Sequence, residues 1–273
     1  MRRIVILSLV GVVSLGIILV AIIPAKNKNK ENIGIEEINY GGGNAFLEEA
    51  KLAENKGQMI EAKQLYEKAM MNIDDVSELK NVQNKIEQLN LETIFSSRMD
   101  DCSINYVVKP NDVLINISKK FKTTVNLIKR ANNLNSDIIK PGQGLKINNC
   151  EFSVVVDKSQ NLLFLKRAGD VIKTYIVSTG KNNCTPIGNF KIINKLENPT
   201  WYKTGEIIEP NDPDNLLGTR WMGFDLESYG IHGTNKPEEL GLQITLGCVR
   251  MRNGDVEEVF DIVPTGTEVL IVD

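Results

Sequence analysis

YGIHGT at residues 229–234 and TLGCVRM at residues 245–251 are the two stretches that decide the fold and the chemistry of this chain. The first holds His232, the one histidine among 273 residues, and the second holds Cys248 directly after a glycine. An imidazole that accepts the proton of a thiol activates the cysteine, and the two residues need to meet only in the fold. The pattern therefore indicates a Cys–His catalytic site, with a buried free cysteine and a satisfied histidine as the alternative.

The surrounding region, from Phe152 onward, shows short strands and no helical periodicity. Turns rich in Gly, Asn, Asp and Pro separate six apolar runs, at residues 154–156, 162–165, 171–177, 190–193, 223–226 and 268–271. Both tryptophans, Trp201 and Trp221, also lie in this region, where we expect the largest core. The pattern predicts a mostly-β sandwich or barrel-like domain over residues 151–273.

Residues 152–273 resemble the YkuD-type L,D-transpeptidase catalytic domain. The family pattern is His-Gly-Thr followed, sixteen positions after the histidine, by the cysteine of Ser/Thr-x-Gly-Cys-Ile/Val-Arg-Met/Leu, and His232 and Cys248 occupy these positions. Two further stretches match, TPIGNF at 185–190 and PTGTEV at 264–269. One position departs: many members have a histidine where this chain has Leu246, which leaves His232 as the sole possible imidazole base.

This resemblance implies an enzyme that forms 3-3 crosslinks between peptidoglycan stem peptides, or attaches a wall protein, through a cysteinyl thioester. Cys248 would be the nucleophile and His232 the base, oriented by the carbonyl of Gly233. The remaining predicted site residues would hold the oxyanion or the substrate: Thr245, Gly247 and Arg250. For Arg250 a structural salt bridge is an equal alternative.

Composition excludes other classes of function. The net charge is −3 and the pI is near 5.5, so we expect no nucleic acid partner, which would need a basic face. A single histidine and four cysteines without paired spacing argue against a zinc site. We therefore expect neither a metal nor a cofactor.

Residues 106–147 predict the order β-α-α-β. A strand at 106–108 leads to a helix at 113–121, capped by Asp112, and a second helix begins after Thr124. A turn at 141–144 precedes the closing strand at 145–147. The alternative to a ligand-binding domain here is a small α+β module without a ligand.

This segment resembles a LysM domain, which we place at residues 102–150. The resemblance implies binding of glycans that contain N-acetylglucosamine, and the candidate contacts are Asn111, Asp112, Asn132 and Asn133. Asn111 stands where the family usually has Gly, but Asn tolerates a left-handed backbone. Cys102 and Cys150 flank the two antiparallel strands, so a disulfide is plausible outside the cytoplasm, with two free thiols as the alternative.

The N-terminal part predicts an anchor and a spacer. The uncharged run from Ile4 to Ile23 is long enough to cross a bilayer, so residues 1–25 predict a transmembrane helix rather than a cleaved signal peptide. Residues 26–44 read as a linker. Residues 45–98 predict a helical hairpin that resembles a tetratricopeptide unit, acting as a spacer or as a partner-binding repeat.

Together these parts predict a multidomain chain of the bacterial cell envelope. It would hold the membrane through its N-terminal helix and carry its C-terminal domains outside the cytoplasm. Three other functions compete with the transpeptidase: an L,D-carboxypeptidase that uses the same Cys–His site, a non-catalytic peptidoglycan-binding protein, and a cytoplasmic redox protein.

Overall fold

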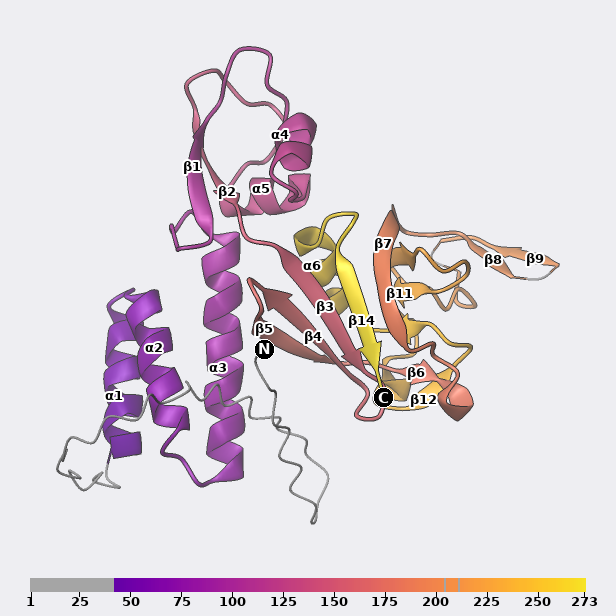
Figure 1. The fold of residues 1–273 in the computed structure, drawn as a ribbon, viewed down its shortest axis with the longest axis horizontal. Coiled ribbons are helices and arrows are strands. Elements are labelled where there is room, and N and C mark those ends of the chain that lie inside the picture. Colours follow the sequence, from indigo (N-terminus) through magenta and orange to yellow (C-terminus); the bar gives the residue numbers. More distant parts are fainter. Residues whose placement is uncertain (1–41, 204, 211) are drawn as a thin grey trace, which may run out of the picture. The chain divides into compact units, whose positions relative to one another are not determined.

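A computed structural model describes residues 42–203, 205–210 and 212–273. In chain order this part of the chain contains three helices, a small βααβ unit and a larger region dominated by strands (Figure 1). We compare each with its prediction in turn.

The segment predicted as a helical hairpin contains three helices, and the first begins at Gly42, inside the predicted linker. They are α1 (Gly42–Asn55), α2 (Met59–Met70) and α3 (Val76–Phe95). Gly57 separates the first two with a φ of +76°, a conformation that glycine adopts without strain. The side chain of Asp75 caps α3 by accepting a hydrogen bond from the Glu78 N–H at 2.8 Å. This helix also contacts the strand-rich region, because Asn90 donates to the carbonyl of Ile172 at 3.0 Å.

The βααβ unit has the predicted element order. Its elements are β1 (Ser103–Val107), α4 (Leu114–Lys120), α5 (Val125–Ala131) and β2 (Gly144–Asn148). The strands are antiparallel, and Cys102 and Cys150 beside their ends form a disulfide whose Cα atoms lie 5.1 Å apart. The disulfide prediction is confirmed. Asn111 has the expected left-handed backbone, with a φ of +70°.

The caps of the two short helices differ. Thr124 caps α5 as predicted, since its hydroxyl accepts from the Leu127 N–H at 2.8 Å. Asp112 does not cap α4; its carboxylate accepts from the Tyr106 hydroxyl at 2.7 Å and from the Lys109 N–H at 2.8 Å. The prediction for Asp112 was wrong because the carboxylate closes the preceding turn instead.

The strand-rich region is built on an eight-stranded mixed sheet with the order β13-β11-β10-β7-β14-β3-β4-β5. The strands from the first half of the region are β3 (Phe152–Asp157), β4 (Leu162–Arg167), β5 (Asp170–Ile176) and β7 (Gly188–Glu197). Those from the second half are β10 (Arg220–Phe224), β11 (Gly230–His232), β13 (Val249–Arg250) and β14 (Glu268–Val272). All six predicted strands are present, within one large sheet where we expected a sandwich or barrel.

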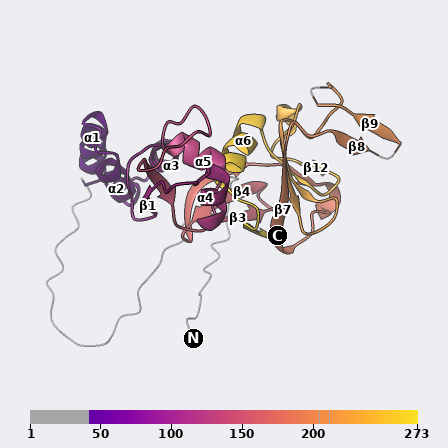
Figure 2. The same ribbon diagram turned by 90° about the horizontal axis from the view of Figure 1, so that it is seen from above.

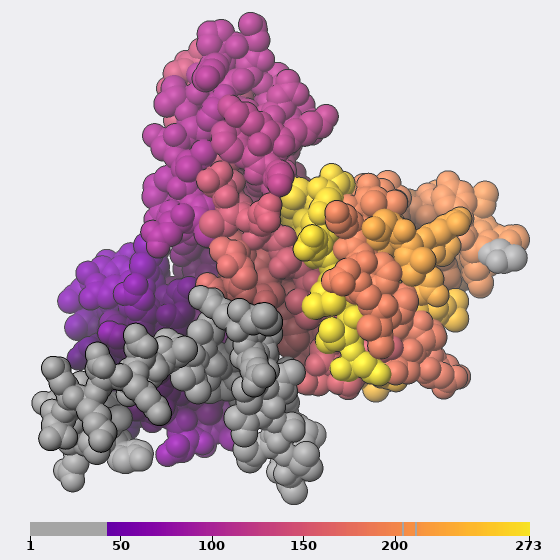
Figure 3. Space-filling view, in the orientation of Figure 1, coloured from indigo at the N-terminus to yellow at the C-terminus, as the bar shows by residue number. Residues whose placement is uncertain are grey.

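Smaller elements complete the region. Strands β6 (Thr179–Gly180) and β12 (Gln243–Thr245) form a two-stranded parallel sheet, and the 3-10 helices η1 (Lys181–Asn183) and η2 (Pro237–Glu239) lie in connections. Strands β8 (Trp201–Lys203) and β9 (Glu206–Ile208) form a hairpin. The space-filling view shows this hairpin extending beyond the side chains around it (Figure 3).

One helix in this region contradicts the absence of helical periodicity that we inferred from the sequence. Helix α6 (Asn253–Ile262) packs against β10 and β11, and two views show it covering the sheet (Figures 1 and 2). Its apolar face consists of Val256, Val259 and Phe260, which are buried in the main core. These residues have the spacing i, i+3, i+4 of an amphipathic helix, but intervening acidic residues made the short run easy to read as a turn.

The predicted fold class needs one correction, because it included a transmembrane helix. Within residues 42–273, as far as the structure describes them, none of the helices combines the length and the apolar character needed to cross a membrane. The run from Ile4 to Ile23 on which that prediction rested lies outside the described residues.

Candidate active site

The sheet brings the two sequence motifs together. Strands β11 and β13 are parallel neighbours, with His232 paired to Arg250 and Ile231 paired to Val249. Side chains alternate between the two faces of a strand, and Ile231 and Val249 are buried in the core. His232 and Arg250 therefore face the opposite side, and the same alternation directs Cys248, the residue before β13, to that side as well.

His232 is held as a neutral imidazole with a defined tautomer. Its Nδ1 lies 2.7 Å from the carbonyl oxygen of Gly233, and a carbonyl can only accept, so Nδ1 carries the hydrogen and Nε2 keeps its lone pair. The ring stacks on Trp221 with centroids 6.0 Å apart and is 4% exposed. Burial lowers the pKa of His232 to about 4, and the charge of Arg250 acts in the same direction. Backbone hydrogen bonds with Gly233 and Leu216 favour the charged form and oppose this shift.

Cys248 is a protonated thiol in this structure. Its sulfur donates a hydrogen bond to the carbonyl of Ser228 at 3.4 Å. Burial raises the pKa of the thiol to about 11, although the backbone of Gly230 and the charge of Arg250 act in the other direction. The sequence interpretation had the imidazole accept the thiol proton, which would leave an ion pair and lower the cysteine pKa. The shifts instead favour a neutral thiol and a neutral imidazole, and among the described residues the hydrogen-bond partner of the Cys248 sulfur is Ser228 rather than His232.

The turn before Cys248 is closed by Thr245 and Gly247. The hydroxyl of Thr245 donates to the Cys248 carbonyl at 2.7 Å and accepts from the Gly247 N–H at 3.1 Å. Gly247 has a φ of +126°, and a Cβ there would come within 2.6 Å of the Tyr229 ring, so only glycine fits. Because its N–H is already engaged, Gly247 holds the turn, and its predicted role as an oxyanion donor remains a prediction.

Arg250 is engaged within the protein. Its guanidinium forms an ion pair with Glu239, and its side chain is 7% exposed. This contact is the structural salt bridge that we weighed against substrate binding. Leu246, at the position where many family members have a histidine, points into solvent and is 93% exposed.

Sequence reasoning gave Cys184 no role, yet its sulfur lies beside the active-site turn. A Cβ added to Gly180 would come within 2.5 Å of the Cys184 sulfur and 3.0 Å of the Gly247 Cα. The Cys184 side chain is an exposed free thiol. Its loop lies far from Cys248 in the sequence, so only the pairing of β6 with β12 could have revealed this proximity.

The candidate glycan-binding residues mostly have internal partners. Asn132 binds both backbone groups of Lys146, accepting from its N–H at 2.7 Å and donating to its carbonyl at 2.8 Å. Asp112 and Asn111 shape the turn before α4, as described above. Asn133, with a φ of +52°, lines an open pocket of about 550 Å³. The glycan-binding role of all four stays a prediction.

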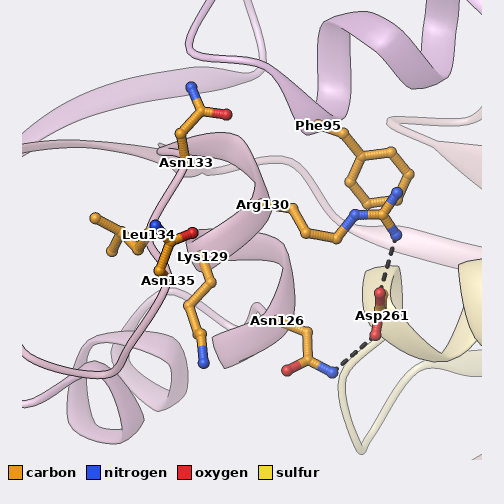
Figure 4. Close-up of a pocket in the computed structure, with 8 residues that line it drawn as sticks. All are labelled: Phe95, Asn126, Lys129, Arg130, Asn133, Leu134, Asn135 and Asp261. Atoms are coloured by element: carbon orange, nitrogen blue, oxygen red, sulfur yellow. Dashed lines mark hydrogen bonds and ion pairs between the residues drawn. The ribbon is translucent and has the colours of Figure 1, made fainter.

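The pocket beside Asn133 has walls from several elements (Figure 4). Arg130 on α5 extends across the ring of Phe95 at the end of α3, 3.3 Å from its centroid. Its guanidinium reaches Asp261 on α6 at 2.9 Å, and Asn126 reaches the same carboxylate at 2.7 Å. The βααβ unit is thus attached to the strand-rich region by charged and polar contacts.

Comparisons with known proteins agree with these observations. The family model described as the L,D-transpeptidase catalytic domain, YkuD, matches residues 151–271, and the LysM domain model matches residues 106–148. The putative L,D-transpeptidase YqjB of Bacillus subtilis is 44% identical over 126 residues, which are 44% of this chain and 70% of that protein. The putative L,D-transpeptidase YkuD of Bacillus licheniformis is 34% identical over 174 residues, 61% of this chain and 97% of that protein.

A solved structure also matches this region. The catalytic domain of the E. faecium L,D-transpeptidase, determined by NMR, is 26% identical, with a TM-score of 0.38. The match covers 45% of this chain and 97% of that domain. Family membership rests on the two Bacillus relatives, which are matched over most of their own length.

Proposed function

This chain belongs to the YkuD family of L,D-transpeptidases and carries a LysM peptidoglycan-binding domain, and from that premise we propose that it forms 3-3 crosslinks in peptidoglycan through a thioester on Cys248. Attachment of a wall protein to the same acyl group is a variant of this reaction. The observation that carries the proposal is the parallel pairing of β11 and β13, which directs Cys248 and His232 to one face of the sheet.

Acylation begins with the neutral thiol. The sulfur of Cys248 attacks the carbonyl carbon of the third stem residue while its proton passes to Nε2 of His232. The bond from that carbon to the nitrogen of the terminal D-alanine breaks, and the imidazolium returns the proton to this nitrogen. Free D-alanine and a thioester remain. Nδ1 keeps its hydrogen bond to Gly233 throughout, which stabilises the transient positive charge.

Deacylation repeats these steps with an amine. The side-chain amine of a second stem peptide attacks the thioester carbonyl, and Nε2 of His232 accepts a proton from it. The bond between carbon and sulfur then breaks, the imidazolium returns the proton to the sulfur of Cys248, and the amide crosslink leaves. In the alternative function, an L,D-carboxypeptidase, water replaces this amine. The exposed Leu246 beside Cys248 provides an apolar surface at the entrance, which favours a peptide acceptor over water.

The proposal is tested by incubating the purified chain with muropeptides and identifying the products by mass spectrometry. We expect dimers linked between two third residues, and we expect Cys248→Ala to abolish them without loss of folding. Cys184→Ala is the matched control, because it removes the other free thiol near the turn. Dimers formed undiminished by the Cys248 variant would refute the assignment of the nucleophile. Release of D-alanine without dimers would favour the carboxypeptidase.

The LysM domain supplies the second part of the proposal. We infer that it holds the enzyme on glycan strands, so that the catalytic site acts on nearby stem peptides. Removal of residues 102–150 should reduce co-sedimentation with purified peptidoglycan, while Cys248→Ala should sediment like the native chain. Equal sedimentation with and without these residues would show that glycan binding lies elsewhere.

A further inference from the structure

The imidazole of His232 has two backbone partners, Gly233 and Leu216, and the Gly233 carbonyl is the one that lies 2.7 Å from Nδ1. The carbonyl that accepts its Nδ1–H belongs to Gly233, and this carbonyl shares a peptide plane with the N–H of Thr234. Because a trans peptide is planar, with its C=O and N–H pointing in opposite directions, a partner that fixes the N–H also fixes the carbonyl. What holds the Thr234 N–H therefore fixes the carbonyl that accepts from Nδ1, alongside the Leu216 backbone and the stacked ring of Trp221.

That partner is the side-chain oxygen of Asn253. Oδ1 accepts from the Thr234 N–H at 3.0 Å and from the Thr219 N–H at 3.2 Å. Asn253 is the first residue of α6, whose buried residues Val256 and Val259 anchor that helix in the main core. The oxygen is therefore held by a rigid element and not by the loop that it supports.

Two glycines, Gly218 and Gly233, lie so close to the Asn253 oxygen that a side chain at either position would collide with it. A Cβ on Gly218 would also come within 2.6 Å of the Gly233 carbonyl carbon. Gly218 has a φ of +63°, which strains any residue with a side chain. Both positions leave room for Asn253 to reach the peptide group.

We propose that Asn253 is a positioning residue for catalysis, which acts through the Gly233–Thr234 peptide group to hold His232 with Nδ1 protonated and Nε2 free. The chain of hydrogen bonds runs from the Asn253 oxygen through this peptide to the imidazole. Without it the carbonyl can rotate away, and Nε2 can then carry the hydrogen and lose its capacity to accept the thiol proton. This inference rests on the proposed role of His232 as the base.

The tautomer can be observed directly, because His232 is the one histidine of the chain. Imidazole ¹⁵N labelling of the full chain gives one pair of nitrogen signals, which need no assignment by mutation. We expect the native chain to show Nδ1 protonated at neutral pH. Asn253→Ala should show a mixture of the two tautomers, and Asn90→Ala should not, although it also loses a buried hydrogen bond.

Activity and titration provide the second measurement. Asn253→Ala should lower kcat by about 10- to 100-fold with little change in KM, because the substrate does not contact Asn253. Asn253→Asp preserves the acceptor, so it should keep the native tautomer. Its negative charge should also shift the imidazole titration upward by roughly one pH unit.

An unchanged tautomer in folded Asn253→Ala would overturn the proposal. If that variant does not fold, Asn253→Asp decides, and an imidazole titration equal to that of the native chain would overturn it. Neither NMR result requires a substrate. A native chain that makes no crosslinks would therefore count against the proposed function, while the tautomer would still decide the role of Asn253.

Discussion

The neutral state of Cys248 has a measurable consequence for its reactivity. Burial raises the thiol pKa from 9.0 to about 11, so at pH 7 the thiolate fraction falls from about 10⁻² to about 10⁻⁴. A more basic thiolate is a better nucleophile, and a Brønsted slope of about 0.4–0.5 returns nearly one power of ten over two units. Alkylation of Cys248 should therefore be about 10-fold slower than that of a small thiol with the ordinary pKa.

The assay uses Cys184→Ser, because Cys102 and Cys150 are joined and the four cysteines then leave Cys248 as the sole free thiol. Iodoacetamide is added at pH values from 6 to 10, and the rate is followed by intact mass. The rate should still be rising between pH 9 and 10, where a small thiol approaches its plateau.

A second substitution tests whether His232 affects the pKa of the Cys248 thiol. His232→Ala in the same background should leave the alkylation profile nearly unchanged, because a neutral imidazole gives little support to the thiolate. Fast alkylation with a plateau at acidic pH, lost on removal of His232, would show an ion pair and refute this account of the site.

Three further predictions concern stability and are measured by urea or thermal unfolding. Arg167→Ala should cost about 3–5 kcal/mol, because the buried guanidinium bonds the partly buried Asp100 at 2.5 Å and also holds Asn148 and the carbonyl of Cys102; a cost below 1 kcal/mol would contradict this. Gly247→Ala should cost about 2 kcal/mol or more, because it combines backbone strain with a collision with Tyr229. Gly57→Ala, also at positive φ but with open space around it, should cost about 1 kcal/mol. Equal costs would show that the collision with Tyr229 does not contribute. Burial lowers the pKa of Lys195 from 10.5 to about 8. Between these pH values the unfolded chain binds a proton that the folded chain does not, so the free energy of unfolding should rise with pH by about 3 kcal/mol. Lys195→Met should remove this rise, and a pH dependence that persists in the variant would assign it to another group.

The sequence was most informative where a local pattern determines the structure. The strand and helix order of the LysM domain follows from its turns and caps, and the antiparallel strands place Cys102 beside Cys150. Both motifs of the candidate site could be identified from their residues. Helix α6 was missed because its buried residues are few and lie among acidic residues; they are Val256, Val259, Phe260 and Ile262.

Charge states depend on packing, which no local pattern records. A histidine beside a cysteine suggests an ion pair, and that reading would hold if both groups were solvated. In the fold, the ring of Trp221 covers the buried imidazole, and Cys248 is partly buried. Desolvation disfavours the imidazolium and the thiolate together, so the neutral pair becomes the resting state.

Positioning residues are hidden from sequence for a different reason. Asn253 lies at the start of a short helix, where an asparagine most often serves the helix itself. Its oxygen instead holds the loop after His232, because parallel pairing of β11 with β13 places the start of α6 beside that loop. The same pairing that directs Cys248 and His232 to one face thus brings in the residue that orients the imidazole. A sheet of this topology brings the proposed nucleophile, base and positioning residue together from segments that the sequence separates.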